Sequence, residues 1–150
     1  MQSAASSLDV GVEEPCGLGP HGQPRRRSLL IVDDDASVAD GLAFLVTGEG
    51  YDVEIAADAN AAAQVLDRRR FDAVLTDLSM PGGGRRWLAR LRATRPHMTV
   101  VVITALEAEA AVFATVFATS AHLADAVLGK PVEAGVLFDL LDNFLPVVRA

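Results

Sequence analysis

Polar residues able to hold a metal or a phosphate follow four separate, largely apolar runs of this chain. Asp33 and Asp34 come after the first run, Asp77 after the second, Thr104 after the third and Lys130 after the fourth. If these runs are parallel strands of one sheet, their carboxyl ends meet at one edge, where ligands bind in such sheets. Carboxylates, a hydroxyl and an ammonium would then converge. That set suits a divalent cation and the transfer of a phosphoryl group to an aspartate.

The three carboxylates predict a magnesium site. Asp33, Asp34 and Asp77 would share a small volume, and their mutual repulsion calls for a counter-charge. Mg²⁺ prefers oxygen ligands and retains several waters, so a few carboxylates and a backbone carbonyl suffice to bind it. Ser79, two residues after Asp77, can offer that carbonyl. We therefore expect Asp33, Asp34, Asp77 and Ser79 to hold Mg²⁺.

The same edge of the sheet suits phosphoryl transfer. Asp77 is the candidate nucleophile, which would form an aspartyl phosphate. Lys130 would neutralise phosphoryl charge as a point-charge ligand. Thr104 could hydrogen-bond a phosphoryl oxygen by moving toward it, which would change the nearby surface. Taken alone, each residue is as well explained by a turn, a strand or a solvated surface. Their joint order at four strand ends favours a phosphoacceptor site.

The composition indicates a globular, cytoplasmic protein. Hydrophobic residues make up 51% of the 150 residues, and the formal net charge of −7 argues against direct nucleic-acid binding. No apolar stretch approaches the roughly 20 residues that span a bilayer, so we expect no membrane contact. The one cysteine, Cys16, excludes an internal disulfide and fits a reducing cytosol.

Two segments differ in composition. Residues 1–27 are interrupted by glycine and proline and predict a flexible N-terminal leader, whereas residues 28–150 alternate β-branched runs with helical patterns and predict one domain. We expect strands over 29–32, 52–56, 73–76, 99–104 and 126–128. We expect helices over 36–48, 60–70, 107–120 and 133–145, and a short one around Trp87 that ends near 95. Asn60 is the candidate cap of the second helix.

This alternation predicts an α/β fold, with a doubly wound five-stranded parallel sheet and helices on both faces. Val53 and Ile55 should point inward from a strand at the sheet edge, whereas the strand over 99–104 is apolar on both faces, as a central strand should be. The final helix should bury five residues: Val136, Leu137, Leu140, Leu141 and Phe144.

Four short pieces carry a family resemblance: Leu30-Ile31-Val32-Asp33-Asp34-Asp35, Asp77-Leu78-Ser79-Met80-Pro81-Gly82, Val102-Ile103-Thr104-Ala105 and Gly129-Lys130-Pro131. Their spacing also fits, with 43 residues from Asp34 to Asp77, 27 more to Thr104 and 26 more to Lys130. Over about residues 28–148, the chain resembles the receiver domain of two-component response regulators. The resemblance implies a flavodoxin-like fold with strand order 2-1-3-4-5. It also implies that Asp34 ligates Mg²⁺ directly, that Asp33 does so through water, and that the Lys130–Pro131 peptide is cis.

The resemblance further implies partners before and after the phosphorylation step. Asp77 would receive its phosphoryl group from a sensor histidine kinase or a histidine phosphotransfer protein, with Mg²⁺ required. The phosphorylated chain would signal to a downstream protein target. A homodimer could form through the face made by the fourth helix, the fifth strand and the fifth helix, although the sequence does not give the oligomeric state. No output domain follows the fifth helix, so we interpret the chain as a stand-alone receiver or a piece of a longer protein.

Two features depart from the family and keep an alternative open. Val127 stands where the family usually has Tyr or Phe, and the segment from Thr104 to Lys130 is longer than usual and rich in alanine. These features motivate a second hypothesis, a phosphorylation-independent interaction module. The intact set argues against it: Asp33, Asp34, Asp77, Thr104 and Lys130. A haloacid-dehalogenase-like phosphatase is a third hypothesis, based on Asp33-Asp34-Asp35, but no later acidic pair completes its metal site near Lys130. We expect a phosphoacceptor and not an enzyme.

Overall fold

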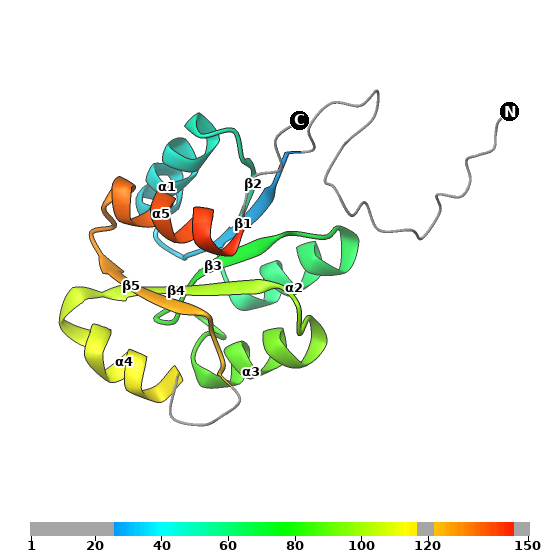
Figure 1. The fold of residues 1–150 in the computed structure, drawn as a ribbon. Coiled ribbons are helices and arrows are strands. Elements are labelled where there is room, and N and C mark those ends of the chain that lie inside the picture. The colour runs from blue at the N-terminus through cyan, green and yellow to red at the C-terminus, as the bar shows by residue number, and fades with distance from the viewer. Residues whose placement is uncertain (1–25, 117–121, 146–150) are drawn as a thin grey trace, which may run out of the picture. The chain divides into compact units, whose positions relative to one another are not determined.

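The computed structural model describes residues 26–116 and 122–145 (Figure 1). Residues 1–25 of the predicted leader and residues 117–120 of the predicted fourth helix lie outside the described residues. Within the described ranges, no helix is long and apolar enough to cross a bilayer.

Strands and helices alternate along the chain. The strands are β1 (Ser28–Val32), β2 (Asp52–Ala56), β3 (Ala73–Asp77), β4 (Thr99–Ala105) and β5 (Ala126–Lys130). The helices are α1 (Ala36–Gly48), α2 (Ala59–Arg68), α3 (Arg85–Thr94), α4 (Glu109–Val116) and α5 (Ala134–Phe144). A short 3-10 helix, Leu106–Ala108, links β4 to α4.

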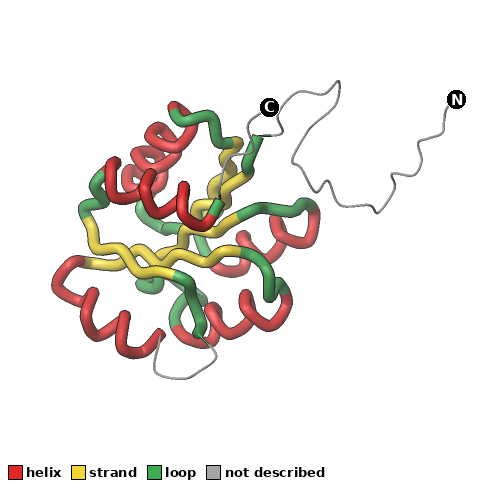
Figure 2. The backbone as a smooth tube through the Cα atoms, viewed as in Figure 1, coloured by secondary structure: helices red, strands yellow, loops and turns green. Residues whose placement is uncertain are grey.

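The five strands form one parallel sheet in the order β2-β1-β3-β4-β5. α1 and α5 cover one face, and α2, α3 and α4 cover the other (Figures 1 and 2). This arrangement confirms the predicted doubly wound fold and its strand order. The chain leaves β1 toward β2 on one side and returns to β3 on the other. The carboxyl ends of β1 and β3 therefore flank the point at which such sheets bind ligands.

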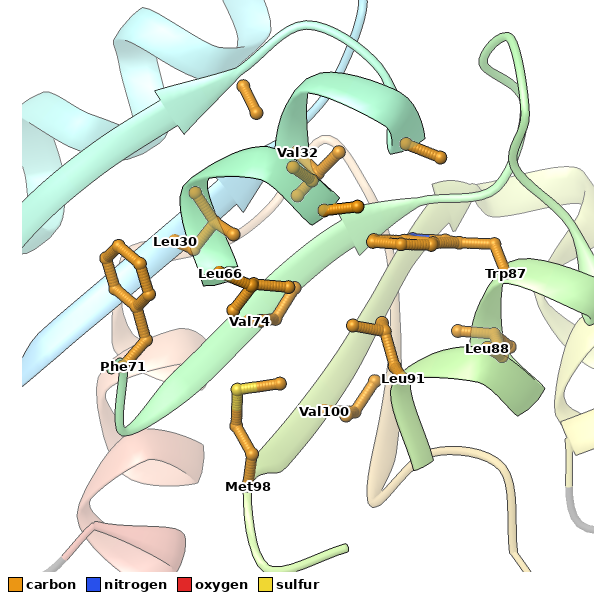
Figure 3. Packing of buried hydrophobic residues seen from close by; sticks show 14 of the residues in the cluster. Leu30, Val32, Leu66, Phe71, Val74, Trp87, Leu88, Leu91, Met98 and Val100 are labelled. Atoms are coloured by element: carbon orange, nitrogen blue, oxygen red, sulfur yellow. The ribbon is translucent and has the colours of Figure 1, made fainter. Parts of the chain in front are cut away.

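Two hydrophobic clusters fill the space between the sheet and its helices, because alternate side chains of a strand point to opposite faces. Val74 packs in the cluster under α2, α3 and α4, whereas Leu75 packs in the cluster under α1 and α5. Figure 3 shows the first cluster, in which the flat ring of Trp87 reaches from α3 toward the end of β3. Thr76 lies two residues after Val74 and is therefore on the α3 side of the strand.

Aspartate side chains start the first two helices. Asp35 caps α1, because its Oδ1 accepts hydrogen bonds from the amides of Ser37 at 3.0 Å and Val38 at 3.3 Å. The cap of α2 is Asp58 and not Asn60: Asp58 has extended backbone angles, and its Oδ1 accepts from the Ala61 amide at 2.7 Å. Asn60 is the second residue of the helix, so it does not occupy the N-cap position. A side-chain cap of this kind stabilises a helix by about 1 kcal/mol.

Three residues expected inside are more exposed than the apolar spacing predicts. Ile55 is 39% exposed, because β2 is the edge strand of the sheet. Val136 and Phe144 are 47% and 40% exposed. α5 buries only a narrow stripe at four-residue spacing, which consists of Leu137, Leu141 and the following Leu145. Val136 and Phe144 fall on the margin of that stripe.

Candidate metal centre

Three carboxylates meet where β1 and β3 end. Asp33 directly follows β1, Asp77 is the last residue of β3, and the two strands pair in parallel up to Val32 and Thr76. One oxygen from each of Asp33, Asp34 and Asp77 lies within 4.8 Å of the other two. Asp33 and Asp77 are 3% and 5% exposed, whereas Asp34 is exposed to solvent. Parallel pairing therefore brings Asp77 close to Asp33 and Asp34, which lie 44 and 43 positions earlier in the sequence.

Asp33 is held by contacts on both of its carboxylate oxygens. Oδ1 accepts a hydrogen bond from the Asp35 amide at 2.9 Å, and Oδ2 accepts one from Lys130 Nζ at 3.1 Å. Its own amide donates to the Ala56 carbonyl at 3.1 Å and extends the pairing of β1 with β2 by one residue. These contacts fix the buried acid in one orientation.

Asp77 is held by the turn that follows it and by the lysine. Its Oδ1 accepts a hydrogen bond from the Ser79 amide at 3.1 Å, and its Oδ2 lies 3.6 Å from Lys130 Nζ. The Ser79 backbone is thus folded back against the carboxylate. This contact brings the predicted ligand Ser79 to the site, through its amide rather than through its carbonyl.

Lys130 reaches the acids from the far side of β4. Its backbone pairs with Ala105 at the end of β4, and its Nζ contacts both Asp33 and Asp77. Partial burial acts to lower the pKa of this lysine. The hydrogen bond to Asp33 and the charge of Asp77 outweigh burial, so the pKa of Lys130 is raised above its ordinary value. The side chain therefore remains an ammonium. The Lys130–Pro131 peptide that follows is cis, as the resemblance implies.

The charges of this cluster fit a divalent cation. Three carboxylates and one ammonium leave two formal negative charges in a largely buried space. The donors are hard oxygen atoms, which Mg²⁺ and Ca²⁺ prefer over nitrogen and sulfur. Asp34 fits the role of a metal ligand well, because it makes no hydrogen bond or ion pair within the residues that the structure describes. The residues present therefore fit Mg²⁺.

Thr104 lies near this cluster but does not contact it. The residue is 2% exposed near the end of β4, and its backbone pairs with Gly129, the neighbour of Lys130. Within residues 26–116 and 122–145, its hydroxyl makes no hydrogen bond, either to Asp77 or to any other group. A buried hydroxyl without a partner is uncommon and calls for an explanation.

Two further residues connect to the site and were not predicted from the sequence. Trp87 Nε1 donates a hydrogen bond to Thr76 Oγ1 at 3.0 Å, and the Thr76 hydroxyl donates to the Asp77 carbonyl, also at 3.0 Å. The sequence predicted a short helix around Trp87 and a strand that contains Thr76, and both predictions are correct. One signal was present, because a buried tryptophan usually needs an acceptor for its indole N–H.

Comparisons with known proteins agree with this fold. A family model described as the response regulator receiver domain matches residues 29–142. The sensory transduction protein RegX3 of Mycobacterium tuberculosis is 42% identical over 83 residues, which are 55% of this chain and 36% of that protein. A response regulator receiver protein of Anaeromyxobacter is 40% identical over 115 residues, which are 76% of this chain and 47% of that protein. The chain thus spans under half of the length of either relative.

Solved structures give the same picture. A receiver domain protein from Methanospirillum hungatei has a TM-score of 0.66 and 31% identity, with 79% of this chain and 92% of that chain covered. A putative response regulator from Chloroflexus aurantiacus has a TM-score of 0.69 and 31% identity, with 81% and 98% covered. Because the family model matches most of the chain and these structures share its fold, the chain belongs to the response regulator receiver domain family.

Proposed function

We propose that the chain is a phosphoacceptor of a two-component phosphorelay, phosphorylated on Asp77 by a sensor histidine kinase or a histidine phosphotransfer protein. The observation that carries this proposal is the environment of Asp77. Its carboxylate is 5% exposed, shares a cluster with two other carboxylates, and lies 3.6 Å from the Lys130 ammonium. A carboxylate in these surroundings is well placed to accept a phosphoryl group, because the neighbouring ammonium can neutralise part of the charge of that group.

The proposed step is an in-line displacement at phosphorus. A carboxylate oxygen of Asp77 forms a bond to phosphorus while the bond from phosphorus to the donor's histidine nitrogen breaks. The electron pair of the broken bond stays on that nitrogen, and the product is an acyl phosphate. Lys130 is within reach of the phosphoryl oxygens because its Nζ already lies beside Asp77 Oδ2. The turn through Ser79 holds the other Asp77 oxygen, which orients the nucleophile.

Mg²⁺ would be held by Asp33, Asp34, Asp77 and the Ser79 carbonyl. When bound, it would supply positive charge to the phosphoryl oxygens as they approach Asp77. Asp34 has oxygens without protein partners among the described residues, which supports direct ligation. Both oxygens of Asp33 already accept hydrogen bonds, which supports a contact through water.

Thr104 would take part after phosphorylation. A phosphoryl oxygen on Asp77 could accept a hydrogen bond from its buried hydroxyl, which has no protein partner among the described residues. The side chain must move to make this bond, and the movement would shift the end of β4 and the start of α4. Signals would therefore pass to a downstream protein target through protein contacts. The face of α4, β5 and α5, where Phe113 is 54% exposed, is our candidate surface for that target or for a homodimer.

One observation favours a different use of the same scaffold. Val127 occupies the β5 position at which the family usually has an aromatic residue, and it packs half-buried against the cluster under α2, α3 and α4. A phosphorylation-independent interaction module is therefore the second candidate function. Partner binding that is equal with and without a phosphodonor would favour this candidate. The intact cluster of Asp33, Asp77 and Lys130 supports the first.

Mass spectrometry of the intact chain tests the proposal. Acetyl phosphate with Mg²⁺ should add one phosphoryl group to the wild type and none to Asp77→Asn. Equal phosphorylation of the two proteins would overturn the assignment of Asp77. A truncated chain tests the domain limits, since we place the phosphoacceptor domain at residues 28–150 and a leader at residues 1–27. Removal of the leader should leave phosphorylation unchanged.

A further inference from the structure

A buried chain of hydrogen bonds joins α3 to the peptide that carries Asp77. Trp87 Nε1 donates to Thr76 Oγ1 at 3.0 Å, and the Thr76 hydroxyl donates to the carbonyl of Asp77 at 3.0 Å. Trp87, Thr76 and Asp77 are 3%, 0% and 5% exposed, so water does not compete for these bonds. We call these two bonds the Trp87–Thr76 relay.

The hydrogen-bonding capacity of each group leaves little freedom to the relay. An indole N–H can only donate, and a threonine hydroxyl has one proton to give. Because Thr76 accepts from Trp87, its own proton is directed to the Asp77 carbonyl. The surroundings are the apolar cluster under α2, α3 and α4, which includes Leu88 and Leu91 (Figure 3). Breaking either bond would leave a buried polar group without a partner, which is costly.

The position of the relay ties it to the acidic cluster. Thr76 points to the α3 side of β3, and Asp77 is the next residue, at the point where the strand ends. The carbonyl of Asp77 belongs to the peptide that leads into the turn through Ser79. That turn places the Ser79 amide on Asp77 Oδ1 at 3.1 Å. A change in the direction of the Asp77 carbonyl would therefore rotate the peptide that orients its carboxylate.

We propose that Trp87 is a positioning residue for Asp77, acting through Thr76, and that the relay couples α3 to the state of the acidic cluster. α3 begins at Arg85, so Trp87 lies in its first turn, ten residues after Asp77 in the chain. Whatever reorients the Asp77 peptide must move the Thr76 hydroxyl or stretch its bond to the indole. The part of this proposal that concerns phosphorylation rests on the proposed function. The coupling to the metal cluster does not.

The first test compares side chains that keep or lose the relay. Thr76→Val removes the hydroxyl at nearly constant volume, Thr76→Ser keeps it, and Trp87→Phe removes the indole N–H. We expect phosphorylation by acetyl phosphate with Mg²⁺ to be roughly tenfold slower in Thr76→Val and Trp87→Phe. Thr76→Ser should restore the rate to within about twofold of the wild type. Equal rates in all four proteins would overturn the proposal.

A control separates positioning from loss of packing. Leu91 lies in the same cluster and is 1% exposed, but it takes no part in the relay. Leu91→Val should lower the melting temperature and leave the rate of phosphorylation unchanged. If Leu91→Val slows phosphorylation as much as Thr76→Val at a similar melting temperature, Trp87 is only a core residue and the proposal fails.

The second test uses the fluorescence of Trp87, the only tryptophan of the chain. We expect addition of Mg²⁺ alone to shift the emission of the wild type and of Thr76→Ser, and not that of Thr76→Val. An unchanged wild-type emission at Mg²⁺ concentrations that raise its melting temperature would overturn the coupling. If the wild type shifts its emission but is not phosphorylated, the proposed function fails and the relay stands.

Discussion

Aspartates lie at both ends of the sheet, with different counter-charges. At the amino-terminal end, Asp125 precedes β5 and accepts hydrogen bonds from Arg92 Nη2 at 3.1 Å and from the Val100 amide at 2.8 Å. Asp72 precedes β3 and lies 3.7 Å from Arg27 Nη1. Each of these acids has an arginine beside it and ties the start of one strand to a neighbouring element.

The carboxyl-terminal end has more acid than base. Among the residues that the structure describes, Asp33, Asp34 and Asp77 lie around the ammonium of Lys130, which contacts Asp33 and Asp77. An unbalanced acidic cluster destabilises a fold unless a cation joins it, whereas a balanced pair has no such need. The two ends therefore differ in purpose: the acids at the amino-terminal end organise strands, and those at the carboxyl-terminal end are suited to bind a cation and a phosphoryl group.

The largest expected effect comes from exchanging one acid at each end. Asp77→Asn should abolish phosphorylation by acetyl phosphate and leave the chain folded. Asp125→Asn should be phosphorylated like the wild type, but it should lose about 1–3 kcal/mol of unfolding free energy, because the Val100 amide and Arg92 lose a charged acceptor. Intact mass and urea denaturation measure the two effects. Loss of phosphorylation in Asp125→Asn would erase the distinction between the two ends.

The cations at the two ends should differ in the same way. Lys130→Met removes the ammonium beside Asp33 and Asp77, so phosphorylation should be on the order of a hundredfold slower. Arg92→Met should leave the rate unchanged and lower only the melting temperature. Intact-mass measurements on samples quenched at a series of times give both rates. If Lys130→Met is phosphorylated at a rate close to that of the wild type, the lysine does not take part in phosphoryl transfer.

Stabilisation of the chain by Mg²⁺ should depend on the acids at the carboxyl-terminal end of the sheet and not on those at the amino-terminal end. At a free Mg²⁺ concentration of about one hundred times Kd, the unfolding free energy of the wild type should rise by about 2.7 kcal/mol. Asp34→Asn should respond much less, because we propose Asp34 as a direct ligand, and Asp125→Asn should respond as the wild type does. Thermal melts with and without Mg²⁺ measure these shifts. A full response in Asp34→Asn would show that the ion binds elsewhere.

The turn after β3 should tolerate less change than the helix after β1. A Cβ added at Gly83 would lie 2.6 Å from the Leu78 carbonyl oxygen. This contact is too short, and because the oxygen belongs to the backbone it cannot move aside easily. We expect Gly83→Ala to cost about 1–3 kcal/mol of unfolding free energy. A Cβ at Gly41, inside α1, meets nothing within 4 Å, so Gly41→Ala should stabilise by about 0.5–1 kcal/mol. Equal effects in denaturation would contradict the packing of this turn.

The smallest expected effect is a dependence on alkaline pH. The pKa of Lys130 is raised from its ordinary 10.5, so the folded state holds this proton more tightly than the unfolded state. Its contribution to stability is therefore complete below pH 10.5 and declines as pH rises through the folded pKa. The difference in unfolding free energy between wild type and Lys130→Met should be constant at neutral pH and shrink above 10.5. A difference that grows with pH would have the wrong sign.

The fold and the approach of the acids could be predicted because they depend on local pattern. Each apolar run is a strand that ends at or next to its polar residue, and parallel order brings those ends together. The prediction that Asn60 caps α2 was wrong because Asp and Asn have similar capping preferences, and only the backbone angles decide between Asp58 and Asn60. The prediction that Val136 and Phe144 are buried was wrong because helical periodicity does not give the width of the apolar stripe that α5 presents to the sheet.

The Trp87–Thr76 relay could not be predicted from the sequence. It joins residues 11 positions apart through the packing of α3 on β3, and that packing depends on how the short turn between them closes. Gly82 and Gly84 have φ values of +76° and +94°, a region that favours glycine, and they set this closure. The sequence shows the glycines, but it does not show which backbone angles they adopt or the path of the turn that results.

The most direct test of the account locates the phosphoryl group after reaction with acetyl phosphate. Tandem mass spectrometry of the digested protein should find one phosphoryl group, on Asp77, formed with Mg²⁺ and not after chelation of the metal. A phosphoryl group on another residue, or one formed on Asp77 equally well without a divalent cation, would contradict the claim that the acidic cluster joins metal and phosphoryl group at a single side chain.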